Sequence, residues 1–207
     1  MKKKRSQTQT KIVKLWKTSF DIKIIEKTRF KIKITKMKYP NLYLGSPKVI
    51  AEAVRYLGIN EIKGKANNQT IMSWAKDVGV DKIYTSDEIA WCGLFVAKVI
   101  LKAGFEVVKD PLWALNWSKF GTRQTVAMLG DVLVFKRDGG GHVGFYVAED
   151  KNYFHVLGGN QSDSVSITRI AKNRCVAIRR CAWKVSQPKE VKQYFVEASG
   201  IISTNEK

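Results

Sequence analysis

Cysteine and histidine are the residues of this chain best suited to nucleophilic and acid–base chemistry, and it has three of the first and two of the second. Cys92 is the favoured nucleophile, because the sequence predicts it in the first turn of a helix that ends at Gly104. Unpaired backbone amides and the helix dipole at such a position favour the thiolate and lower the pKa of the thiol. The alternative is that Cys92 is a small buried residue on an apolar helix.

His142 is the candidate for the base that would activate this thiol. It follows the glycine run at 139–141 and opens a predicted strand, so we expect it at the end of a sheet beside a flexible approach. A helix start packed on a sheet edge can bring a thiol within hydrogen-bond reach of such an imidazole. A plain glycine-rich hairpin is the alternative, and only the pairing with Cys92 separates the two.

Strand register suggests a residue that would orient the imidazole. If Asp150–Asn152 is a three-residue loop, Glu149 faces Tyr153, and His142 lies opposite Asn160 on the same face of an antiparallel pair. Asn160 is then the predicted orienting residue.

Two other loop lengths change this assignment. A two-residue loop would place Gly159 opposite His142, and a four-residue loop would place Gln161 there. In the three-residue register His155 faces Val147, on the other side of the sheet from His142, so we predict a structural role for His155.

The sequence predicts neither a metal site nor a cofactor. Cys175 and Cys181 lack CxxC spacing, and the two histidines are expected on opposite faces, so zinc has no four-ligand set. The glycine run at 139–141 precedes a strand, and it cannot present the amides of a helix start to phosphate. An odd number of cysteines without framework spacing also argues against a set of structural disulfides.

Helices in the first half of the chain and strands in the second would position these residues. Apolar spacing and end signals predict helices from Ser46 to Gly58, from Gln69 to Val78, and from about Asp87, as a cap, to Gly104. Short β-type runs separated by turn residues predict strands at Asp131–Arg137, His142–Glu149, Tyr153–Gly158, Val165–Ile170 and Ala177–Trp183. Helices followed by an antiparallel meander predict an α+β fold.

The positive charge of the chain is concentrated at its start. The net charge is +19, and residues 1–40 contribute 14 basic and 2 acidic side chains, or +12, which leaves +7 for the rest. At 207 residues we expect a basic arm (1–40), one domain (45–185) and a C-terminal tail (186–207). The alternation of apolar and basic residues at Phe30–Ile34 and Met37–Tyr39 predicts a cationic strand.

Two kinds of hydrophobic segment are not expected. Charged residues interrupt every apolar run, so no segment reaches the roughly 18 apolar residues of a membrane-spanning helix. Lys2–Arg5 resemble the start of a signal peptide, but Lys11, Lys14 and Lys17 interrupt its apolar region, so we predict no Sec-type leader.

Four blocks follow one another along the chain: Trp91–Cys92, Gly130–Phe135, Gly141–Val147 and Leu157–Asp163. In this order they resemble the NlpC-type and CHAP-type cysteine peptidases of bacterial cell walls, and more closely a compact subfamily found in phage lysins and secreted bacterial effectors. The resemblance extends from about Gly45 to Trp183.

This resemblance implies a papain-like fold in which the nucleophile helix packs on the antiparallel sheet. It implies that Cys92 attacks an amide, that His142 serves as base and then acid, and that Asn160 orients His142. The implied substrate is peptidoglycan, cut in the stem peptide, in its cross-bridge or at the link to muramic acid, without a cofactor. Gln161, Trp91 and Trp117 are expected to line the substrate groove, although buried tryptophans are the alternative.

Two rival functions remain. A nucleic-acid or anionic-surface binding protein would explain the charge, but a folded nucleic-acid module should carry its basic face within the fold. A catalytically inactive relative that binds wall fragments is less favoured, because Cys92, His142 and Asn160 are all present. We therefore expect a hydrolase of the bacterial cell wall, released by phage, carried by a virion or delivered by a secretion system.

The basic arm is expected to bind anionic wall polymers or phospholipid headgroups, although a solvated tail without a specific role is the alternative. Deleting residues 1–40 should weaken sedimentation with whole walls and flatten the salt dependence of binding, because the +12 charge is lost. Hydrolysis of small soluble muropeptides should be unchanged. A truncated protein with the same salt slope would show that the arm is no electrostatic tether.

Overall fold

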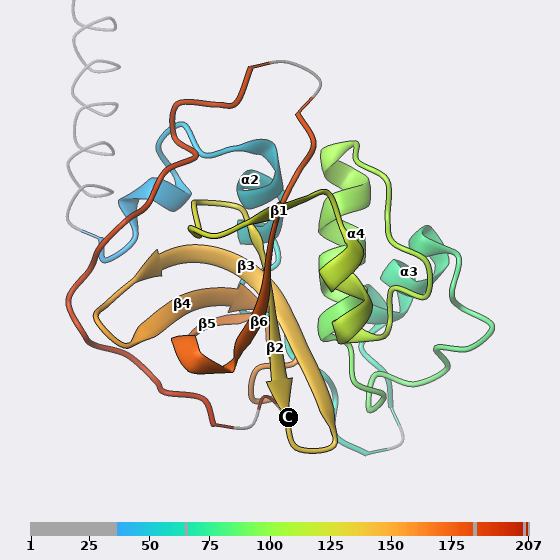
Figure 1. Ribbon diagram of the computed structural model, residues 1–207. Coiled ribbons are helices and arrows are strands. Elements are labelled where there is room, and N and C mark those ends of the chain that lie inside the picture. The colour runs from blue at the N-terminus through green and yellow to red at the C-terminus, as the bar shows by residue number, and fades with distance from the viewer. Residues whose placement is uncertain (1–36, 65, 184–185, 205, 207) are drawn as a thin grey trace, which may run out of the picture. The chain divides into compact units, whose positions relative to one another are not determined.

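The chain folds into helices followed by strands, as the hydrophobic pattern predicts (Figure 1). This computed structural model describes residues 37–64, 66–183, 186–204 and 206. The chain divides into two units, Met1–Pro40 and Asn41–Lys207. In the first unit, Met37 and Lys38 form bends and not the predicted strand, and Phe30–Ile34 lies outside the described residues.

Three α-helices come first in the second unit. They are α2 (Lys48–Val54), α3 (Gln69–Val78) and α4 (Cys92–Ala103). The bounds of α3 agree with the prediction, and the Asn68 side chain caps it by accepting the amide of Thr70. Both α3 and α4 end at a glycine in the left-handed conformation, Gly79 and Gly104, where a β-carbon would be strained.

The start of α4 differs from the prediction. We expected Asp87 to cap this helix, but α4 begins at Cys92 with Trp91 in the capping position. The Asp87 carboxylate instead accepts the backbone amides of Ile62 and Asn68, at 3.0 and 2.7 Å. It therefore stabilises the loop before α3, and Cys92 becomes the first residue of its helix.

The strands form one six-stranded antiparallel sheet, which confirms the α+β class. Its order is β1-β6-β2-β3-β4-β5, so that β2 to β5 make a meander of neighbouring strands. The bounds are β1 Thr122–Gln124, β2 Val132–Arg137, β3 Gly140–Glu149, β4 Tyr153–Gly158, β5 Ser166–Ala171 and β6 Cys175–Arg180. The short strand β1 was not predicted. The 3₁₀ helices, also unpredicted, are η1 (Pro40–Leu42), η2 (Ala114–Lys119) and η3 (Lys172–Arg174).

Helix α4 packs against β3 and is buried along most of its length. The ring of Phe95 meets the ring of Phe145 edge to face, with centroids 6.1 Å apart. Close approach needs glycine: a β-carbon on Gly159 would lie 2.6 Å from atoms of Phe95 and Trp91. The start of α4 is thereby held against the end of β4.

The C-terminal residues are part of the fold. The backbone of Glu149 bonds to Tyr194 and Val196, and farther along the tail Ile201 accepts a bond from Arg169. Near the end, Glu206 forms a two-pronged ion pair with Arg174, at 2.8 and 2.7 Å. Residues beyond 186 therefore extend from the end of β3 to β5 and then to η3. Among the described residues, no helix is both long and apolar enough to cross a membrane.

Candidate active site

The thiol of Cys92 lies at the start of α4, beside the residue that follows His142. Cys92 is only 5% exposed. Burial raises the pKa of the Cys92 thiol, while the backbone amides of Val143, Gly93 and Cys92 itself, together with the charge of Arg137, act in the opposite direction. The influence of the Val143 amide places the sulfur next to the strand that carries His142.

The expected lowering of the thiol pKa is therefore wrong for this structure. The amides at the helix start do favour the thiolate, as the sequence argument required. Burial has the larger effect on the pKa, because the free-energy cost of removing a thiolate from water exceeds the stabilisation that these amides provide. The resting group is the neutral thiol of Cys92.

His142 lies near the start of β3 and is completely buried. It pairs with Phe135 on β2, whose ring centroid lies 6.4 Å from that of the imidazole. Burial lowers the pKa of His142 to about 4; the Glu206 charge and the bond to Gln161 raise it, and the Arg137 and Arg174 charges add to the lowering. The imidazole is therefore neutral at pH 7.

Gln161 fixes which nitrogen of this neutral ring carries the proton. Its Nε2 donates to three backbone carbonyls, those of Val156, Gly158 and Ser166 at 3.2, 3.4 and 2.6 Å. The Thr168 hydroxyl donates to its Oε1, at 2.9 Å. The amide can therefore present only its oxygen to the imidazole.

This oxygen requires a proton on the facing nitrogen of the imidazole. Nε2 of His142 lies 3.2 Å from Oε1 of Gln161 and must be the donor. Nδ1 then carries a lone pair, and among the described residues this buried atom has no hydrogen-bond partner. Cys92 is not that partner. His142 lies on the Phe135 face of the sheet, whereas Phe95 of α4 packs on Phe145, whose side chain alternates to the other face. A contact between a nucleophile and its base often forms only when substrate binds.

The structure gives the contact with His142 to Gln161 and not to the predicted Asn160. Asn160 adopts a left-handed backbone conformation, with φ of 55°, immediately after β4 has ended. The chain turns there, and the next side chain returns beneath Gly158. A β-carbon on Gly158 would lie 2.9 Å from Oε1 of Gln161 and 3.1 Å from Nε2 of His142.

The register behind the Asn160 prediction holds only in part. Glu149 faces Phe154 and not Tyr153, so four residues, 150–153, separate this pair although only 150–152 lie between the two strands. A bulge at Val147 then restores the expected register, and His155 faces Ala148 where Val147 was predicted. Register alone misleads at the site because β4 ends before position 160.

The tryptophans predicted to line a substrate groove are buried. Trp91 and Trp117 have no exposed surface. The indole nitrogen of Trp91 donates to Glu61, at 3.1 Å, and that of Trp117 donates to the carbonyl of Pro111, at 3.0 Å. Gln161 is 1% exposed and contacts His142, so none of the three offers a surface to substrate.

His155 lies in a separate buried cluster. Its Nε2 is 3.0 Å from the Asp150 carboxylate, which also accepts a bond from Arg169 at 2.8 Å. Burial acts to raise the pKa of Asp150, but bonds from Arg169, His155 and nearby backbone amides together hold it well below its usual value. His155 alternates with Phe154 and Val156 along β4, which places it on the opposite face from His142.

The other two cysteines are free thiols, as is Cys92. Burial raises the pKa of Cys175 to about 11 and that of Cys181 to about 12. In the part of the chain that the structure describes, no group of three His, Cys, Asp or Glu side chains is arranged to hold a metal ion.

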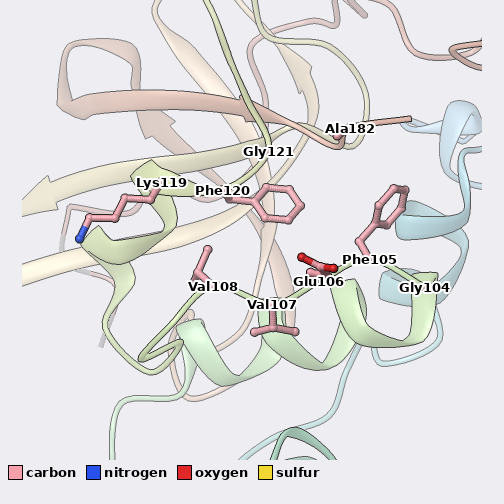
Figure 2. A pocket seen from close by; sticks show the side chains of 9 residues that line it. All are labelled: Gly104, Phe105, Glu106, Val107, Val108, Lys119, Phe120, Gly121 and Ala182. Carbon is pink, nitrogen blue, oxygen red and sulfur yellow. The ribbon is translucent and has the colours of Figure 1, made fainter. Parts of the chain in front are cut away.

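A cavity of about 350 Å³ lies at the other end of α4 (Figure 2). It is lined by residues 104–108, 119–121 and Ala182, and Figure 2 shows the rings of Phe105 and Phe120 on its wall. Since Cys92 starts the helix and Gly104 ends it, this cavity is remote from the candidate nucleophile.

Two residues that act on His142 were missed from the sequence. Thr168 fixes the oxygen of Gln161, and Glu206 supplies negative charge from the tail. The alternation of β5 would have suggested an inward position for Thr168, but no pattern links Glu206 to a site more than 60 residues away.

Comparison with known proteins assigns the chain to no family. No family model matches the sequence, and no curated protein matches it.

Replacing Gln161 tests its role as the orienting residue. We expect Gln161→Ala to lower turnover by roughly 10- to 100-fold, because the imidazole loses a buried hydrogen bond and can rotate or change tautomer. Asn160→Ala should lower it by less than about threefold, since no hydrogen bond of its side chain is found in the described structure. Melting temperatures of both variants control for stability. Greater damage in Asn160→Ala would reverse the assignment.

The depressed pKa of His142 predicts the acid limit of activity. A base must be unprotonated, so the rate should stay level down to about pH 5 and fall near pH 4, the folded pKa, in place of the ordinary 6.5. The unfolded state binds the additional proton between these values, so stability should also fall as pH drops from 6.5 towards 4. A half-maximal rate near pH 6.5 would show a solvated imidazole instead.

Proposed function

We propose that this chain is a cysteine peptidase or amidase with a papain-like arrangement, and that it hydrolyses an amide bond of peptidoglycan. The observation that carries the proposal is the state of His142. Gln161 Oε1 accepts the hydrogen bond from Nε2, and the lone pair on Nδ1 has no partner in the part of the chain that the structure describes. The next residue along the strand, Val143, is the one whose backbone amide acts on the Cys92 thiol. A buried histidine with a purely structural role would be expected to use both nitrogens.

The first half of the reaction forms an acyl-enzyme. Nδ1 of His142 removes the proton from the Cys92 thiol as the sulfur attacks the carbonyl carbon of the amide. The resulting oxyanion is stabilised by backbone amides at the start of α4, which have no partners within the helix. The imidazolium then donates its proton to the leaving amine as the C–N bond breaks.

The second half returns the enzyme to its starting state. Nδ1 removes a proton from water, and the hydroxide attacks the thioester carbonyl. The C–S bond breaks, the carboxylic acid leaves, and the thiolate of Cys92 takes the proton back from His142. Oε1 of Gln161 accepts the hydrogen bond from Nε2 throughout, so the ring does not need to rotate between steps.

Peptidoglycan is the proposed substrate because of the four sequence blocks that resemble cell-wall cysteine peptidases. Three of these blocks lie in elements that contact one another: Cys92 starts α4, which packs on the β3 strand that carries Gly141–Val147, and β3 pairs with β4, where the block Leu157–Asp163 begins. The bond cut would lie in the stem peptide, its cross-bridge or the link to muramic acid, and the enzyme would act at the bacterial cell wall.

The basic arm would hold the enzyme on its substrate. With 14 basic and 2 acidic side chains in residues 1–40, it is suited to an anionic wall polymer or a membrane surface. The same charge is the observation that favours the second candidate, a nucleic-acid or anionic-surface binding protein without hydrolase activity.

Replacement of Cys92 tests the proposed chemistry. Cys92→Ala should abolish the release of soluble fragments from purified sacculi, measured by mass spectrometry, because the proposed acyl-enzyme cannot form without the thiol. The melting temperature should change little, because the substitution removes only the sulfur atom and leaves a small cavity.

The other cysteines provide the control. Cys175→Ala and Cys181→Ala remove free thiols of the same chain and should retain digestion of sacculi. Full lytic activity in Cys92→Ala would refute the cysteine-peptidase proposal, and fragment masses from the wild-type protein would identify the bond that is cut.

A further inference from the structure

Residues 111–115 lie between the two halves of the candidate active site. A β-carbon on Gly93, the residue after the nucleophile, would be 2.3 Å from the carbonyl oxygen of Pro111. A β-carbon on Gly141, the residue before His142, would be 2.7 Å from the side chain of Leu115. This segment therefore touches both the start of α4 and the start of β3.

Trp113 is the middle residue of this segment and is 74% exposed, the largest value among the large apolar side chains of the described residues. Leu115 is also exposed, at 43%. Leaving a tryptophan in water forgoes the stabilisation that burial gives the indoles of Trp74, Trp91 and Trp117. An exposed apolar surface beside a reaction centre is typical of a ligand-binding surface.

The backbone that carries Trp113 is firmly held. Its amide bonds to the carbonyl of Asp110, and the Asn116 side chain donates to Lys109 and Asp110. The buried indole of Trp117 donates to the carbonyl of Pro111, at 3.0 Å. The exposed indole is therefore presented by a fixed support, which reduces the entropy lost when a ligand binds.

The composition of this segment favours an uncharged ligand with an apolar face. Residues 112–118 contain no Asp, Glu, Lys or Arg, in a chain that is 27% charged. Within residues 112–118 the ionised groups of a stem peptide would find no charged side chain, whereas an N-acetylated sugar ring is neutral. The C–H groups on one face of a pyranose carry partial positive charge and pack well against the negative face of an indole.

We propose that Trp113, with Leu115 beside it, forms a saccharide subsite that binds an N-acetylated amino sugar of the glycan strand. This inference rests on the proposed function and narrows it. Trp113 is two residues from Pro111, whose carbonyl oxygen approaches Gly93. A sugar bound to Trp113 would therefore place the scissile amide close to the glycan. The bond between muramic acid and the stem peptide is then the favoured substrate.

Binding to peptide-free glycan strands tests this subsite without requiring catalysis. In a Cys92→Ala background, we expect isothermal titration calorimetry to show binding of these strands. Adding Trp113→Ala should weaken binding by about tenfold or more, whereas Trp113→Phe should weaken it by no more than about threefold, because a smaller aromatic face remains. Phe195→Ala is the matched control, since Phe195 is 71% exposed and lies in the tail, and it should bind as the parent does.

Three results would overturn the subsite. The first is that the parent protein does not bind the glycan strands, and the second is that Trp113→Ala leaves their binding unchanged. The third is that Trp113→Ala weakens binding of a sugar-free stem peptide and leaves glycan binding intact, which would assign the surface to peptide. Melting temperatures would verify that each variant is folded. Failure of the wild-type protein to digest sacculi would count against the proposed hydrolase and would leave the glycan titration as a separate result.

Discussion

The geometry of the site depends on the way in which Gln161 is held. Its amide nitrogen is surrounded by carbonyls from β4 and from the start of β5, and its oxygen receives the Thr168 hydroxyl from β5. These groups meet only because β4 and β5 are neighbours in the meander. The sheet therefore sets the orientation of one amide, and that amide sets the tautomer of His142.

Burial of both reacting groups has a joint consequence. It raises the pKa of the Cys92 thiol and lowers that of the His142 imidazole, so each change favours the uncharged form. A resting thiol and a neutral imidazole are thus preferred over a thiolate–imidazolium pair. In the proposed reaction the proton moves when the substrate carbonyl is in place, and the thiol is less open to alkylation or oxidation before then.

The sequence predicted the elements well and the details of the site less well. Apolar periodicity was sufficient for α3 and for β4, because each has clear end signals. It failed at the start of α4, where the carboxylate of Asp87 bonds to distant backbone amides instead of capping the following helix. A local pattern cannot reveal a partner 25 residues away.

The candidate site, too, could be predicted only in part. Cys92 and His142 could be selected because each stands at a predicted element end. The choice between Asn160 and Gln161 depended on a bulge at Val147 and on the end of β4, neither of which leaves a signal in the sequence. The burial of Trp91 and Trp117 likewise depends on how α4 and η2 pack.

The C-terminal tail extends the site beyond the boundary that the sequence suggested. A domain ending at residue 185 would exclude Glu206, yet this carboxylate is 1% exposed, pairs with Arg174 and raises the pKa of His142. Without this negative charge, nothing from the described part of the tail would oppose the charges of Arg137 and Arg174, which already lower the pKa of His142. The tail thus offsets the positive charge near the base, so the complete unit, and not the sheet with its helices alone, determines the electrostatics of the site.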